Sequence, residues 1–209
     1  MDDPPELVVP DAAAWHDWLS ENHTDPAGVW LVLAKKGTAE RGSPSERSAP
    51  CPTSLNYDQA LDEALCHGWI DGQVRRRDEA TFRQRFTPRR ARSPWSQRNV
   101  EIIARLGTQG RMHPAGLAEV ERAKGDGRWE AAYAGQAAIE VPEDVAAALA
   151  ANPRAAAMFE ILTKQNRYAV LLRVHSAKRA DTRERRIAQF VDMLARGETV
   201  YPQRRNIGD

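Results

Sequence analysis

The sequence predicts an α+β protein with a small antiparallel sheet, helices packed on that sheet and a helical C-terminal segment. Residues 28–36 form an aliphatic and aromatic run typical of a buried strand. Residues 69–77 and 80–87 resemble a β-hairpin, and most of the chain after residue 114 has helical periodicity. The length of 209 residues suffices for a hydrophobic core. We expect an α+β domain over 1–130 and a helical domain over 140–209 docked on it.

Charge is balanced over the whole chain but not along it. With 30 basic and 29 acidic residues, the net charge of +1 does not by itself indicate a nucleic-acid or membrane partner. Residues 1–27 nevertheless hold seven acidic residues and no Lys or Arg, whereas 73–98 hold nine Arg. Such asymmetry indicates either an anion-binding face or a basic surface that meets the acidic one within the fold.

Three features of the sequence indicate the cellular compartment of the protein: its cysteines, its N-terminus and its hydropathy. Cys51 and Cys66 form no CxxC pair, and the N-terminus lacks the basic start and apolar block of a signal peptide. No apolar stretch approaches the roughly 18 residues of a membrane-spanning helix. We therefore expect a cytoplasmic protein with reduced thiols and no membrane insertion.

The N-terminal part of the chain is predicted to form a helix, a strand and a long loop in this order. Asp11 precedes a segment with Trp15 and Trp18 at helical spacing, which predicts a capped amphipathic helix. The strand at 28–36 should be covered on both faces. The segment 37–54 is rich in Gly, Pro and Ser, which is typical of a long surface loop, and we expect it to be mobile.

A second capped helix leads into the hairpin. Asn56 followed by Gln59 indicates a capping box, and Gly68 can take the left-handed conformation that ends the helix. With Asp78 and Glu79 as the hairpin loop, the predicted register pairs Arg75 with Phe82, Gln73 with Gln84 and Asp71 with Phe86. The alternation then places Trp69, Asp71, Phe82 and Phe86 on one face, and Arg83 and Arg85 on the other.

The later helices are marked by their first residues. Ser93 or Ser96 caps one helix, and Pro114 opens the next. Further helices start at Pro142 and at Asn152-Pro153, and another lies around 167–175. A last helix from about 177 to 196 should point these residues inward: Ala180, Ile187, Phe190, Val191 and Leu194.

Four segments carry a resemblance to a known family: 64–72, 85–99, 123–129 and 177–187. Together they are similar to the bacterial YdeI/OmpD-associated family, whose members are also called bacteriocin-protection proteins. The resemblance runs over most of the chain, and its first two motifs are long and rich in Trp. It implies a role in tolerance to antimicrobial peptides or related stress, without a reaction or catalytic residues. The loop at 37–54 departs from the family pattern.

The hairpin and its connector bring together side chains that could hold a ligand. An Asp held by Arg is a strong charge-assisted pair, and Trp faces beside guanidinium groups can hold a flat or cationic ligand. We expect a partly accessible cleft in which Asp71 pairs with an Arg from 85–90 or from the last helix. The candidate ligand-binding residues there are Trp69, Asp71, Arg85, Arg89, Arg90, Ser93 and Trp95. In the structural alternative, both Trp residues belong to the core and Asp71 is a buried partner of one Arg.

Arg183 is a further candidate. Its helical phase places it inside the apolar arc of the last helix, so it requires a partner. We expect a buried carboxylate, from Asp71 or the acidic N-terminal segment, at a junction between the last helix and the α+β part. Arg183→Ala would then cost about 3 kcal/mol. A ligand-site role for Arg183 is the alternative.

The sequence gives little support for metal or cofactor chemistry. The five histidines show no HxxxH spacing and the two cysteines no CxxC spacing: His16, His23, His67, His113, His175, Cys51 and Cys66. A phosphate-cradling loop of the GxxxxGK type is absent. We expect neither a metal nor a cofactor.

The preferred function is ligand binding: a small-molecule or peptidic antibacterial compound, or an anionic cell component, is captured in the Trp- and Arg-lined cleft. Two alternatives stay open. An enzyme would use Asp71 or His67 as a general base. A nucleic-acid binder would lose affinity steeply with salt, and would place phosphates on Arg75, Arg76, Arg77, Arg83, Arg85, Arg89 and Arg90.

Overall fold

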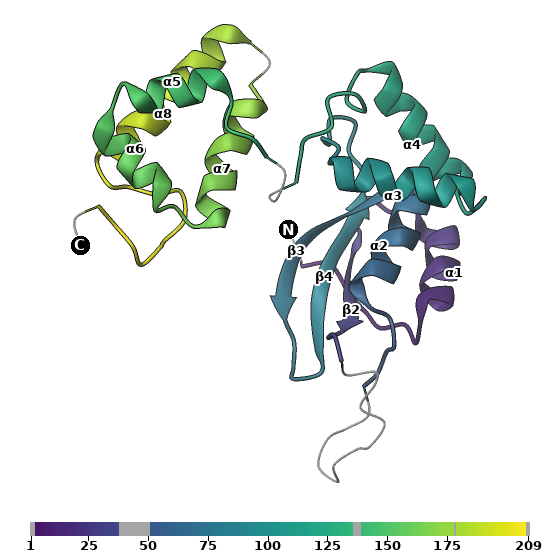
Figure 1. The fold of residues 1–209 in the computed structure, drawn as a ribbon. Helices are drawn as coiled ribbons and strands as arrows, with labels where there is room; N and C mark the ends of the chain where they lie inside the picture. Colours follow the sequence, from purple (N-terminus) through teal and green to yellow (C-terminus); the bar gives the residue numbers. More distant parts are fainter. Residues whose placement is uncertain (1–2, 38–50, 136–138, 178, 208–209) are drawn as a thin grey trace. The chain divides into compact units, whose positions relative to one another are not determined.

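The computed structural model describes residues 3–37, 51–135, 139–177 and 179–207. The chain divides into two compact units, residues 1–132 and 133–209 (Figure 1). The first unit contains a sheet with helices on it, and the second is built from helices. The predicted α+β class is confirmed. Docking of the helical domain on the α+β domain stays a prediction.

The sheet of the first unit has four strands in the order β1-β2-β4-β3. The central strand β2 (Val29–Ala34) is antiparallel to β4 (Thr81–Pro88), which pairs in turn with β3 (Trp69–Arg76). Every residue of β2 is buried, as predicted for a strand covered on both faces. The sheet is mixed rather than antiparallel, because β1 (Glu6–Leu7) adds to β2 in parallel. A two-residue strand is too short to show a periodicity in the sequence.

The hairpin departs from the predicted register near its loop. Asp71 faces Phe86 as predicted, but the register shifts before Val74, so the next pairs are Val74–Gln84, Arg75–Arg83 and Arg76–Phe82. Residues 77–80 form the loop, which is longer than the predicted pair Asp78-Glu79. The cause is Asp78, whose carboxylate accepts hydrogen bonds from the backbone N–H groups of Ala80 and Thr81.

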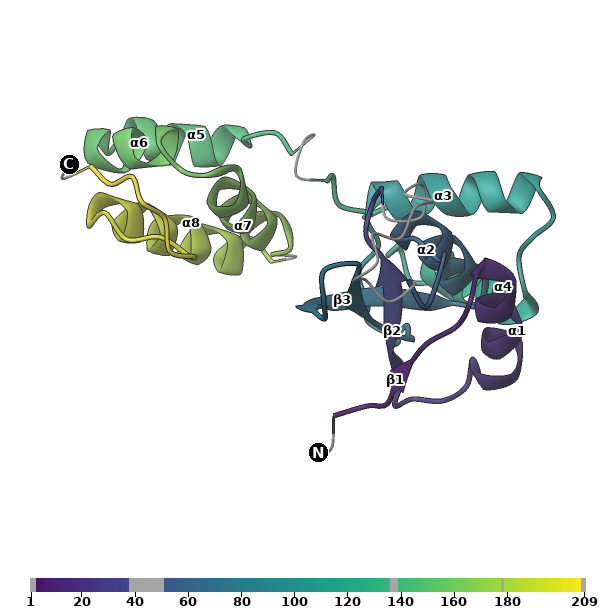
Figure 2. The ribbon, with the colours of Figure 1, turned by 90° about the horizontal axis from the view of Figure 1, so that it is seen from below.

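The helices α1 (Ala12–Asn22) and α2 (Tyr57–Cys66) lie on the same side of the sheet in both views (Figure 1, Figure 2). Both helices start with the predicted side-chain caps, and α2 ends at the predicted glycine. Asp11 accepts a bond from the N–H of Ala14, and Asn56 forms the capping box with Gln59. Gly68 ends α2 at a φ of 77°.

Two more helices complete the first unit. Helix α3 (Gln97–Thr108) is capped by Ser96, and α4 (Pro114–Gly125) begins at Pro114 as predicted. The core between helices and sheet contains the fully buried aromatic residues Trp15, Trp69, Phe86 and Trp95. The ring centroids of Trp15 and Trp69 are 6.2 Å apart in an edge-to-face arrangement.

The second unit consists of α5 (Glu143–Ala150), α6 (Pro153–Glu160), α7 (Lys164–His175) and α8 (Ala180–Ala195). Its own core includes Val145, Phe159, Val170, Ile187 and Leu194. Ala180 is exposed, so its predicted inward position is wrong, because it is the first residue of α8. None of the described helices is long and apolar enough to cross a membrane.

The sequence predicts a mobile loop over 37–54. Residues 38–50 of it lie outside the described residues. Its end is held in place: Thr53 is buried, and the N–H of Ser54 donates to the carbonyl of Pro10 at 2.8 Å. The last residues of the predicted loop, Thr53 and Ser54, therefore pack beside the start of α1.

Candidate functional site

The two tryptophans of the predicted cleft are core residues. Trp69 is 0% exposed and Trp95 is 1% exposed. The indole Nε1 of Trp69 donates to the backbone carbonyl of His23 at 2.8 Å. Because neither ring reaches the surface, these two side chains cannot line an open cleft, and the structural alternative holds for them.

Asp71 has a different partner from the one predicted. Its Oδ2 accepts a hydrogen bond of 2.9 Å from the Tyr57 hydroxyl, and within the described residues its carboxylate forms no ion pair with Arg or Lys. The predicted Arg partner is wrong, because α2 places Tyr57 beside Asp71. Burial and, after it, the Asp71 charge raise the pKa of Tyr57 to about 12.

Four predicted residues do lie together, in the connector 88–95, which begins at the last residue of β4. The guanidinium of Arg89 stacks on the Trp95 ring, 3.6 Å from its centroid, and donates to the carbonyl of Pro94 at 3.2 Å. The N–H of Arg90 donates to Ser93 Oγ at 3.1 Å, and the N–H of Ser93 donates to the carbonyl of Arg90 at 2.9 Å. These contacts hold the connector in a defined turn.

Arg85 lies apart from these residues, on the opposite face of the sheet. Its guanidinium is 6.0 Å from the centroid of the Trp30 ring and donates to the carbonyls of Phe86 and Ala27. Partial burial lowers the pKa of Arg85 from its ordinary value. The predicted alternation of the strand, with Arg85 facing away from Asp71, is confirmed here.

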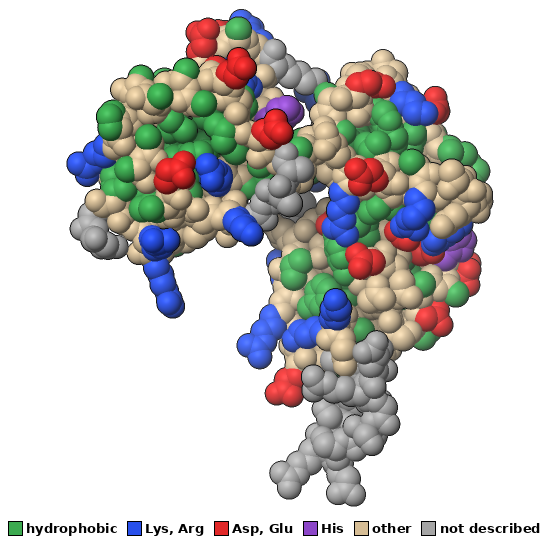
Figure 3. Space-filling view, in the orientation of Figure 1, with side chains coloured by type: hydrophobic (Ala, Val, Ile, Leu, Met, Phe, Trp, Pro, Cys, Tyr) green, Lys and Arg blue, Asp and Glu red, His purple; other side chains and the backbone are tan. Residues whose placement is uncertain are grey.

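The acidic N-terminal segment meets the basic hairpin within the fold. Arg75 contacts Asp3 at 2.5 Å, and Glu6 contacts Arg77 at 3.0 Å and Arg83 at 3.4 Å. Acidic and basic side chains also neighbour one another over the visible face in Figure 3. Part of the charge asymmetry is therefore internal pairing, which reduces the number of hairpin arginines available to phosphates. Nucleic-acid binding stays a prediction.

Arg183 lies in the second unit and pairs there with Asp144 of α5. Its Nε and Nη2 reach the two carboxylate oxygens at 2.6 and 2.8 Å, and its Nη1 donates to the carbonyl of Val174 at 3.2 Å. The predicted partners, Asp71 and the acidic N-terminal segment, are wrong. The pair is also partly exposed, at 26% for Arg183 and 45% for Asp144.

We expect Arg183→Ala to cost about 1 kcal/mol or less in a urea melt, because partly exposed ion pairs contribute little. The exposed Arg185→Ala should stay within about 0.5 kcal/mol of wild type. The guanidinium of Arg183 lowers the pKa of Asp144 from 3.8, so the pair stabilises the fold above this value and loses its contribution as the pH falls through the lowered pKa. A loss near 3 kcal/mol would contradict this account.

Four histidines that are far apart in the sequence form a row in the first unit. The ring centroids are 4.9 Å apart for His16 and His67, 4.7 Å for His67 and His113, and 4.9 Å for His113 and His23. His67 is buried, and the other three are partly exposed. Burial, followed by the neighbouring histidine charges, lowers the pKa values of His67 and His113.

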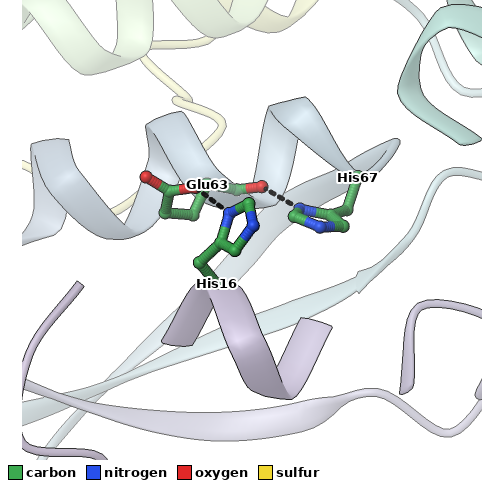
Figure 4. Close-up of side chains that lie close together, drawn as sticks. All are labelled: His16, Glu63 and His67. Carbon is green, nitrogen blue, oxygen red and sulfur yellow. Dashed lines mark hydrogen bonds and ion pairs between the residues drawn. The ribbon is translucent and has the colours of Figure 1, made fainter. Parts of the chain in front are cut away.

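Glu63 joins this row at the His16 end (Figure 4). Its Oε2 lies 2.9 Å from His16 Nδ1, and its backbone carbonyl lies 2.9 Å from His67 Nδ1. Arg111 holds the other carboxylate oxygen of Glu63. His67 Nε2 faces the hydroxyl of Ser20 at 3.3 Å. Two helices therefore supply a compact group of nitrogen and oxygen atoms that the sequence analysis did not assemble.

A sequence signal for this group does exist. Glu63 and His67 are four residues apart at the end of α2, and His16 and Ser20 are four residues apart on α1, so each pair lies on one helix face. Glu63 and His67 form a Glu-x-x-x-His pattern, which lies outside the HxxxH and CxxC spacings typical of His and Cys ligands. That the two faces meet follows from the packing of α1 on α2.

Cys66 lies beside this group and is a buried thiol. Burial, and then the Glu63 carboxylate, raise its pKa to about 12, so the reactive thiolate is scarce at neutral pH. We expect iodoacetamide to label the partly exposed Cys51 of the native protein and to spare Cys66 until the chain is denatured. Mass spectrometry of the labelled peptides measures this. Rapid native labelling of Cys66 would contradict the burial.

Comparison with known families gives two matches. Residues 7–119 match a family described as a domain of unknown function (DUF8412), and residues 138–197 match the family described as Bacteriocin-protection, YdeI or OmpD-Associated. No curated protein and no solved structure matches the chain. The predicted resemblance is confirmed over the helical unit. The motifs at 64–72 and 85–99 instead fall in the range of the first family.

Proposed function

The chain belongs to the family described as a domain of unknown function (DUF8412), and from this premise we propose that it protects cells against bacteriocins or related antibacterial compounds by binding a ligand. The helical unit matches the bacteriocin-protection family. The match at 138–197 is the observation that supports the protective role. The two free thiols, Cys51 and Cys66, support a reducing compartment, and we propose that the protein acts in the cytoplasm.

The connector 88–95 is the proposed binding surface. Arg90 and Arg92 are exposed, while the neighbouring Arg89 and Trp95 are buried and stacked on each other. The Ser93 hydrogen bonds close the turn that presents the two exposed side chains. A turn that is already ordered loses less conformational freedom when it binds a ligand.

The ligand chemistry follows from the two guanidinium groups. Each can donate two parallel hydrogen bonds to a carboxylate or a phosphate. We therefore propose a ligand with such an anionic group, on a small molecule, a peptide or a cell component. The binding surface is an exposed turn instead of the cleft expected from the sequence, since Trp69 and Trp95 are buried.

Survival of cells tests the proposal. The full chain is expressed in a bacteriocin-sensitive strain, and the minimal inhibitory concentration is compared with that of cells carrying an empty vector. We expect wild type to raise this concentration and the double variant Arg90→Ala/Arg92→Ala to lose the effect. Arg76→Ala is the matched control, because Arg76 is an exposed arginine of the same unit outside the connector.

Two results would contradict the proposal in different ways. If wild type gives no protection, the protective role is wrong. If the double variant protects as well as wild type, the role stands and the connector is not the binding surface. A purified chain that binds duplex DNA, with affinity falling steeply as salt rises, would favour the nucleic-acid alternative.

A further inference from the structure

We propose that His16, Glu63 and His67 form a binding site for a divalent transition-metal ion of the Zn²⁺ class. Each side chain offers one ligand atom, and the three ligand atoms lie within 4.8 Å of one another. Figure 4 shows His16 on α1 pointing toward Glu63 of α2 and His67, the residue that directly follows α2. This site is separate from the connector and does not depend on the proposed function.

The set of ligand atoms suits such an ion. Two imidazole nitrogens and one carboxylate oxygen are ligands that Zn²⁺ accepts, and a three-residue set leaves a fourth position for water or another ligand. A site of oxygen ligands alone would favour Mg²⁺ or Ca²⁺, whereas two imidazoles favour Zn²⁺, Co²⁺ or Ni²⁺. Glu63 and His67 are both buried.

Hydrogen bonds outside the three ligand atoms orient the side chains. The Nδ1–H of His67 donates to the backbone carbonyl of Glu63 at 2.9 Å, which leaves the lone pair on Nε2 available. Metal-binding histidines commonly donate their other ring N–H to a carbonyl in this way. Arg111 holds one oxygen of Glu63, so that Oε2 faces His16 Nδ1 at 2.9 Å.

The distances allow an ion with modest side-chain movement. Ligand bonds of about 2.0–2.2 Å in a tetrahedral site place the donor atoms about 3.4 Å apart. His16 Nδ1 and Glu63 Oε2 are already at 2.9 Å, so an ion would replace the hydrogen bond between them. The His16 side chain is 46% exposed, which gives it room to adjust and gives the ion a path from solvent.

Calorimetric titration of the tag-free full chain with Zn²⁺, after dialysis against a chelator, tests the site. We expect one ion per chain. Glu63→Gln and His16→Ala should each weaken binding by about 100-fold or more, since the first replaces the carboxylate by a neutral amide and the second removes a ligand atom. His175→Ala is the matched control: it removes a histidine of α7 and should leave the affinity unchanged. Circular dichroism checks that each variant is folded.

Titration with Co²⁺ adds a spectroscopic readout, because its visible absorption bands report nitrogen and oxygen ligands. These bands should appear with wild type and His175→Ala, and not with His16→Ala. His16 is partly exposed, so this variant keeps the test valid even if Glu63→Gln fails to fold. No binding by wild type would overturn the proposal. So would equal affinity in wild type and His16→Ala, or an equal loss in His16→Ala and His175→Ala.

Discussion

Gly116→Ala should destabilise the protein by about 3 kcal/mol or more, because the new methyl group has no space. Gly116 lies in the first turn of α4, against the last residue of α2. A Cβ there would be 2.0 Å from the carbonyl oxygen of Cys66 and 2.8 Å from its carbonyl carbon. Both atoms belong to the backbone, so relief requires a shift of α4 or α2. Urea denaturation measures the loss in the free energy of unfolding.

Gly125→Ala is the matched control on the same helix. No atom lies within 4 Å of the position that its Cβ would take. Since alanine favours helix over glycine, we expect no loss, and a gain of up to about 1 kcal/mol. Similar losses in both variants would show that α4 is intolerant of alanine for some reason other than its contact with Cys66.

Glu119→Ala should cost about 2 kcal/mol, because Arg128 loses one of its two carboxylate partners among the described residues and keeps only Asp126. Glu119 is 4% exposed and pairs with Arg122 and with Arg128, whose Nη1 lies 3.2 Å from the carboxylate. The Arg128 side chain is itself only 10% exposed. Its Nη1 also donates to the carbonyl of Ser93 at 3.0 Å, so the loss should extend to the connector and reduce protection by the variant.

Glu121→Ala is the matched control, because it removes the same charge from an exposed position. Glu121 is on the same helix, its side chain is 71% exposed, and it pairs with Lys124 at 2.8 Å. We expect its substitution to stay within about 0.5 kcal/mol of wild type in the same urea melt. If both glutamate variants lost equal stability, the buried pair of Glu119 with Arg128 would not be the cause.

The elements that the sequence predicted well are those built by short-range contacts. Asp11 and Asn56 cap the helices that directly follow them, and Gly68 ends α2 by its own backbone conformation. The Asn56 hydrogen bonds reach only three residues along the chain, so the residue types in a short window suffice to predict them. The predicted register of the hairpin is wrong near its loop. The side chain of Asp78 bonds to the next backbone N–H groups and forms a turn longer than two residues.

The candidate site was predicted in part for the same reason. Arg89, Arg90, Ser93 and Trp95 are neighbours in the chain, so their contact in the connector follows from proximity. The partners of Asp71 and Arg183 lie 14 and 39 residues away, at Tyr57 and Asp144. Helical phase and strand alternation give the face on which a side chain lies, and leave open which element covers that face.

By itself, then, the sequence determined the α+β class, most helix and strand positions and the resemblance of the helical unit to the bacteriocin-protection family. Tertiary structure alone decided that Trp69 and Trp95 are buried and that His16 lies beside Glu63, 47 residues away. The physical reason is the range of the interactions. Caps and periodicity act within a few residues, whereas burial and side-chain pairing depend on which elements the hydrophobic core brings together.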